Sequence, residues 1–133
     1  MAWHPYDLDH LALEIVLKAR KLDPDSLNQA YKMRAACAYG LERFWGEHLR
    51  LADKEIAKAA FIADVWRAFT GIMHKADPTI LLPDSMMSKR ADEVTIKAMA
   101  QQLWSLEAQD QQVCLAVLTS FCDSIVWWVQ RLK

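Results

Sequence analysis

Three side chains of types that ligate metal ions lie close together near the N-terminus. Asp7, His10 and Glu14 are spaced by three and four residues, which places them on one face of a helix. Di-metal helical bundles use Glu-x-x-His pairs on two helices together with further Glu ligands, and no Glu-x-x-His occurs in this chain. We therefore interpret the three residues as a solvated helix face, continued by Lys18, and expect neither a metal nor another cofactor.

Two arginines are each followed by a histidine at short spacing. Four residues separate Arg43 from His48, and six separate Arg67 from His74. At about 100° per residue, the first pair points about 140° apart, whereas Arg67 and His74 point within about 20° of each other. In chemistry on a phosphodiester, an arginine can hold the phosphate while an imidazole of near-neutral pKa moves the proton. Arg67 and His74 are thus the better catalytic candidates, with Asp64 near the same face.

This spacing, in a chain expected to be all-helical, resembles the Arg-x(4–6)-His signature of HEPN ribonucleases. The resemblance covers the eight residues from Arg67 to His74 and the fold class. It implies that Arg67 positions the scissile phosphate and that His74 assists proton transfer, in a cleft between two chains. The family commonly has a polar residue directly after the arginine, where this chain has Ala68. The other interpretation is an exposed strip in which Asp64 and Arg67 form an ion pair at i, i+3.

The composition is that of one globular domain, 1–133. Hydrophobic residues make up 53% of the 133 residues and charged residues 25%, which is too apolar for a disordered chain. Lys and Arg total 16 and Asp and Glu total 17, giving a net charge of −1, so nucleic acid is not an expected partner. We see no apolar run near the roughly 18 residues that a membrane span needs. The N-terminus also lacks the basic and apolar regions of a secretory signal.

Three cysteines bear on the cellular compartment. Cys37, Cys114 and Cys122 are odd in number and form no Cys-x-x-Cys pair. This pattern disfavours both a disulfide framework and a zinc site. We expect three buried thiols in a protein of the reducing cytoplasm.

The scarcity of helix breakers predicts an all-α fold, a compact bundle of about five mostly antiparallel helices. Only three Gly and four Pro occur in the chain. Apolar residues at helical spacing predict helices over 7–22, 27–52, 54–75, 89–107 and 111–131. The expected N-caps are Asp7, then Asp25 or Ser26, then Asp53 and Ser88. The polar run 109–112 is expected to form the last turn, and the apolar residues at 80–82 to pin the preceding loop to the core.

The predicted helix 27–52 carries a heptad-like stripe, and the same spacing continues to Met73. The stripe consists of Leu27, Tyr31, Arg34, Ala38, Leu41, Trp45, His48 and Ala52. One helix over 27–75 would be roughly 70 Å long, which is too long for a compact domain, so we expect a break at 52–54. An arginine such as Arg34 on this stripe either reaches the surface or pairs with a carboxylate, and an anion site is the alternative.

The run Ile125-Val126-Trp127-Trp128-Val129 contains more consecutive apolar residues than one buried helix face can hide. Trp127 falls on the polar side of its helix, together with Ser120, Asp123, Ser124 and Gln130. An exposed tryptophan beside small polar groups is typical of an interaction hot spot. Either the N-terminal segment around Trp3 covers Trp127, or a second copy or another partner does, or the tryptophan is exposed without a role.

We therefore expect a non-catalytic protein-interaction module, such as an adaptor, an inhibitor or an assembly subunit. It would form a homodimer or bind another protein through Trp127, Val126 and Trp3. The alternative is a ribonuclease that acts through Arg67, His74 and Asp64. A further alternative is a bundle that binds a small molecule in an internal cavity lined by Trp66, Phe69 and Met73.

Overall fold

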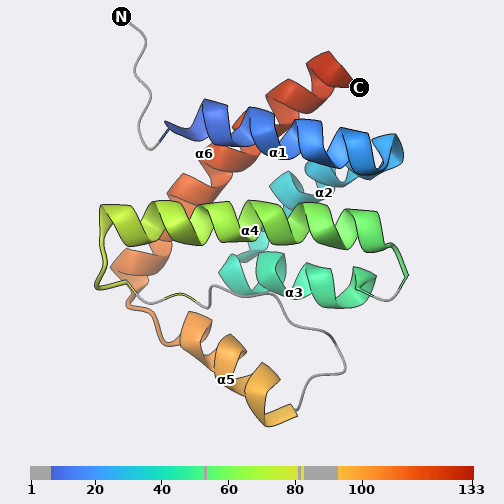
Figure 1. Ribbon diagram of the computed structural model, residues 1–133. Coiled ribbons are helices and arrows are strands. Elements are labelled where there is room, and N and C mark those ends of the chain that lie inside the picture. Colours follow the sequence, from blue (N-terminus) through green and yellow to red (C-terminus); the bar gives the residue numbers. More distant parts are fainter. Residues whose placement is uncertain (1–6, 53, 81, 83–92) are drawn as a thin grey trace, which may run out of the picture.

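The computed structural model describes residues 7–52, 54–80, 82 and 93–133, and every regular element within these ranges is a helix (Figure 1). In chain order these are α1 (Leu8–Leu22), the 3-10 helix η2 (Pro24–Asn28), α2 (Gln29–Ala36), the 3-10 helix η3 (Cys37–Tyr39), α3 (Leu41–Leu51), α4 (Ile56–Ala76), α5 (Glu93–Trp104) and α6 (Ala108–Leu132). The predicted all-α bundle is confirmed, with six α-helices in the described part where about five were expected.

Helix α4 is central, and other helices pack against it from several sides. α1 lies beside α4 and runs in the opposite direction, α3 packs along α4, and α6 crosses behind both α1 and α4 in Figure 1. α2 packs against α6, and α5 contacts α3 at the periphery. The apolar side of α4 is buried as predicted, through Phe61, Ile62, Val65, Trp66, Phe69, Ile72 and Met73.

Aromatic rings form the middle of the core. Trp66 is fully buried and packs between Phe44 of α3, at 6.0 Å between ring centroids, and Phe69, at 5.3 Å. Trp45 is also buried, whereas Trp104 and Trp127 are exposed. Because each buried ring contributes roughly 2–3 kcal/mol of hydrophobic stabilisation, the exposed tryptophans are spare apolar surface rather than core.

The N-terminal boundaries are close to those predicted, but the caps differ. Asp7 has left-handed backbone angles, φ 60° and ψ 35°, and its side chain makes no capping hydrogen bond. Its carboxylate instead lies 2.8 Å from His10 Nδ1. After α1, Asp23 caps the chain in place of the expected Asp25 or Ser26, because its Oδ1 accepts a hydrogen bond from the Asp25 N–H at 3.0 Å. Proline at the first position of η2 has no N–H, so Asp25 supplies the first donor that the cap can reach.

The predicted continuous helix 27–52 is wrong, because Gly40 interrupts it. This glycine has φ 108° and ψ 169°, a conformation that is strained for any residue with a Cβ. The interruption changes the buried face, so Tyr31 and Ala38 of the predicted stripe are exposed. Before Gly40 the buried apolar residues are Leu27, Ala30, Met33 and Cys37, and after it they are Leu41, Phe44, Trp45 and Leu51.

The predicted break before α4 is confirmed. α3 ends at Leu51 and α4 begins at Ile56, while the expected cap Asp53 lies outside the described residues. In the loop after α4, Ile80 is buried and Leu82 packs against the core, as expected. Leu81 of the same prediction lies outside the described residues.

The turn between α5 and α6 comes earlier than the predicted turn at 109–112. α5 ends at Trp104 and α6 begins at Ala108, so the polar run forms the first turns of α6. The reason is a capping contact: Gln111 Nε2 donates to the carbonyl oxygen of Leu106 at 2.9 Å and to that of Trp104 at 3.4 Å. The side chain of Gln111 therefore satisfies carbonyl groups at the end of α5 and in the turn from within α6. The expected cap Ser88 lies outside the described residues.

Candidate functional site

Helix α6 has one buried face and one face that water reaches. The buried residues are Cys114, Leu118, Phe121, Cys122, Ile125 and Val129. Spacings of three and four residues place Gln109, Val113, Ala116, Ser120, Asp123 and Trp127 on the opposite side, where all six are exposed. We refer to these six residues as the outer face of α6.

The outer face is poor in charge. Between Ala108 and Gln130 the only charged residues are Asp110 and Asp123, whereas the 25% charged content of the chain predicts about six in a segment of this length. Asp123 accepts a hydrogen bond from Arg34 Nε at 2.6 Å across the α2–α6 contact. Its charge is therefore neutralised within the chain.

Trp127 is the largest side chain on the outer face, and it is 48% exposed. Its ring meets Trp128 edge-on at 4.7 Å between centroids, and Arg131 Cζ lies 4.1 Å from the centroid of the Trp127 ring. A surface hollow of about 350 Å³ beside it is lined by Asp9, Asp123, Ser124, Trp127 and Trp128. The sequence indicated the neighbours Asp123 and Ser124. It did not indicate Asp9, which reaches the hollow only because α1 packs against α6.

The other predicted interface residues differ from Trp127. Val126 is partly buried and packs against the core, because its position on α6 is turned towards the side that faces α2. Trp3 and the N-terminal segment that contains it lie outside the described residues.

Arg34 and two cysteines form a polar group beneath the α2–α6 contact. The hydrogen bond to Asp123 and the charge of that carboxylate raise the pKa of the Arg34 guanidinium, so Arg34 forms a salt bridge at the core edge. The buried Cys37 and Cys122 thiols lie 3.8 Å apart between Sγ atoms. The hydrogen bond between the two thiols lowers the pKa of Cys37 and raises the pKa of Cys122, and burial raises the pKa of Cys122 further.

Cys114 is the third buried thiol. Burial raises its pKa to about 11, so it is uncharged at neutral pH. All three cysteines are free and buried, as predicted. The structure adds the proximity of Cys37 and Cys122, which are 85 residues apart in the sequence and have no spacing signal.

The candidate metal ligands near the N-terminus belong to an exposed helix face. Asp7 and His10 pair with each other, Glu14 is exposed, and Lys18 Nζ lies 3.0 Å from Asp64 Oδ2 of α4. No group of three or more metal-ligating side chains occurs among the residues that the structure describes.

The candidate catalytic residues Arg67 and His74 are both exposed on α4. Arg67 Nη1 lies 3.4 Å from Asp64 Oδ1, and Asp64 also receives Lys18. Arg67 and Asp64 therefore have the ion-pair geometry of the structural interpretation. Arg67 and His74 lie on α4, so neither residue belongs to the outer face of α6.

The histidine of the predicted stripe and the residues predicted to line an internal cavity lie within the core. His48 is buried, and its Nδ1 lies 2.6 Å from the carbonyl oxygen of Trp45. Trp66, Phe69 and Met73 are buried, and none of them lines the hollow beside Trp127, the one beside Tyr39 or the one beside Lys75.

No protein-family model matches the chain, and no curated protein or solved structure is significantly similar to it. Among the described residues, α6 is long and apolar enough to cross a membrane by length and composition alone. Core helices of soluble proteins pass the same test, and α6 carries six buried core residues. The site must therefore be interpreted from its own geometry.

Proposed function

We propose that the protein is a non-catalytic interaction module, an assembly subunit in which the outer face of α6 pairs with the same face of a second copy. The observation that carries this proposal is a water-exposed helix face with almost no charge and with Trp127 at its C-terminal end. The outer side of a surface helix is normally polar and charged. Depletion of charge together with an exposed tryptophan is typical of an interface.

The pattern of the outer face is self-complementary. Val113 and Trp127 lie seven residues on either side of Ser120, and the span between them is about 21 Å. In two antiparallel α6 helices related by a two-fold axis at Ser120, Trp127 of each copy would lie beside Val113 of the other. The small side chains of Ala116 and Ser120 near the axis allow the two helices to approach closely.

Charges near the ends of α6 favour the same antiparallel pairing. Asp110 lies in the first turn of the helix and Arg131 in the last. Antiparallel pairing brings Arg131 of one copy towards Asp110 of the other, and opposite charges across an interface favour that orientation. The carboxylate of Asp123 near the axis is already neutralised by Arg34 of its own chain.

Sedimentation velocity on paired variants tests this proposal. Ala116→Glu and Trp127→Ser change the outer face, and we expect each to raise the dimer dissociation constant at least about tenfold. Ala98→Glu and Trp104→Ser are matched controls, because Ala98 and Trp104 are exposed on α5. The controls are expected to sediment like the native chain. Equal association in all four variants would place any interface elsewhere.

A further inference from the structure

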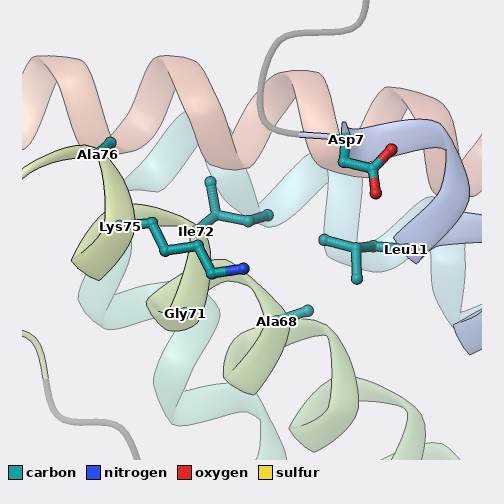
Figure 2. Close-up of a pocket in the computed structure, with 7 residues that line it drawn as sticks. All are labelled: Asp7, Leu11, Ala68, Gly71, Ile72, Lys75 and Ala76. Atoms are coloured by element: carbon teal, nitrogen blue, oxygen red, sulfur yellow. The ribbon is translucent and has the colours of Figure 1, made fainter.

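A hollow of about 550 Å³ lies between the start of α1 and the last turns of α4 (Figure 2). It is lined by Asp7, the residue before α1, by Leu11 of α1, and by Ala68, Gly71, Ile72, Lys75 and Ala76 of α4. The α4 residues share one side of their helix because they are spaced by three and four. Ligand sites of small organic molecules have this range of volume and a mostly apolar lining with a few polar groups.

Small residues keep the hollow open. Ala68 and Ala76 provide only methyl groups, and a Cβ added at Gly71 would meet no atom within 4 Å. In Figure 2, Leu11 projects from α1 and Ile72 from α4 into the space between the two helices. The lining therefore gives an aliphatic group contact on two sides without displacing any side chain.

One rim of the hollow carries the Lys75 ammonium, a cation that has no partner among the residues the structure describes. No hydrogen bond or ion pair joins the Lys75 ammonium to any described residue, and Figure 2 shows its side chain extended over the turn that holds Gly71. The carboxylate of Asp7, on the other rim, is already 2.8 Å from His10 Nδ1. A ligand with a negative end would therefore find an unneutralised cation at an apolar surface.

The start of α1 adds to this preference. Asp7 makes no side-chain cap, so the N–H groups of the first turn of α1 have no side-chain acceptor at that residue. A helix N-terminus favours negative charge. The ammonium of Lys75 and the N-terminus of α1 thus both favour an anionic group at this hollow.

We propose that the hollow binds an amphipathic carboxylate, an unbranched aliphatic chain with one terminal carboxylate. The chain would lie on Leu11, Gly71 and Ile72, and the carboxylate would pair with Lys75. A cation in the last turn of α4 also complements the helix dipole, which accounts for a lysine there but not for the open space beside it. This site is separate from the outer face of α6 and does not depend on dimer formation.

Isothermal titration calorimetry with decanoate and with decanol, its uncharged counterpart, tests the site. The native protein is expected to bind decanoate more tightly than decanol. Lys75→Met should weaken decanoate binding about threefold to fivefold, as for a partly exposed ion pair, and leave decanol binding unchanged. Gly71→Leu fills the hollow and should weaken binding of both ligands at least about tenfold.

Gly46→Leu is the matched control, because Gly46 is also inside a helix and an added Cβ there meets only Glu42 Oε1, at 3.9 Å. This variant should bind both ligands like the native protein, and circular dichroism should show native helix content in all variants. Equal binding of decanoate and decanol by the native protein would overturn the assignment of Lys75. Undiminished decanoate binding by Gly71→Leu would overturn the site itself.

Discussion

At the scale of single residues, two polar side chains on apolar faces have opposite environments. Arg34 pairs with Asp123 and stays partly exposed at the core edge. Gln29 is 1% exposed, and neither its amide oxygen nor its amide nitrogen has a hydrogen-bond partner. Burying an unpaired amide costs roughly 1–3 kcal/mol. Arg34 therefore needs no functional explanation, whereas Gln29 is a local weakness of the fold.

We predict that Gln29→Met raises the free energy of unfolding by about 1–2 kcal/mol, because it removes the unpaired amide and keeps a side chain of similar length. Urea unfolding followed by circular dichroism measures this change. Gln29→Glu is the opposing control and should destabilise the fold, because it buries a charge. A stability loss in Gln29→Met would mean that the amide has a partner in solution.

At the scale of the elements, two glycines have different roles. Gly40 ends η3 in a conformation that only glycine adopts easily, whereas Gly71 lies within α4 and faces open space. The positive φ of Gly40 is what divides the predicted helix 27–52. Gly71 has helical backbone angles, and no neighbouring atom is close enough to exclude a side chain at this position.

Alanine at the two positions should therefore have opposite effects. Gly40→Ala is expected to lower the free energy of unfolding by about 1–3 kcal/mol, because φ 108° is strained for alanine. Gly71→Ala should raise it by about 0.5–1 kcal/mol, because alanine loses less backbone entropy in a helix. Thermal and urea unfolding measure both variants. Effects of the same sign would contradict the assignment of the helix break to Gly40.

The sequence predicts where the helices lie better than it predicts which face of each helix is buried. The apolar stripe of α4 was correct because no glycine conformation or side-chain cap interrupts its period. The stripe over 27–52 was wrong before Gly40, because periodicity does not reveal which glycine adopts a positive φ. The polar run at 109–112 was misread for a similar reason, because the contact of Gln111 with Leu106 depends on the fold of the turn.

At the scale of the whole molecule, the sequence indicated part of the outer face of α6 but nothing of the hollow beside Lys75. The exposure of Trp127 followed from five consecutive apolar residues on one helix, and the structure agrees. The contribution of Asp9 and the hollow beside Lys75 both depend on how α1 packs against other helices. The spacing within a single helix carries no information about such contacts.

The proposed dimer and the HEPN resemblance make different predictions at this scale. A two-chain ribonuclease cleft would bring Arg67 and His74 of both copies together, whereas the proposed pairing uses the outer face of α6, to which neither residue belongs because both lie on α4. We expect Arg67→Ala and His74→Ala to leave the association of the chain unchanged. Sedimentation velocity on these variants, beside Trp127→Ser, measures the difference.

The most direct test of the proposed function is the solution mass of the native chain by light scattering over a wide concentration range. We predict a mass that rises with concentration towards twice the chain mass of 15.3 kDa, and that stays near the chain mass in Ala116→Glu. A native chain that remains at 15.3 kDa at every concentration would contradict pairing of the outer face of α6 with a second copy.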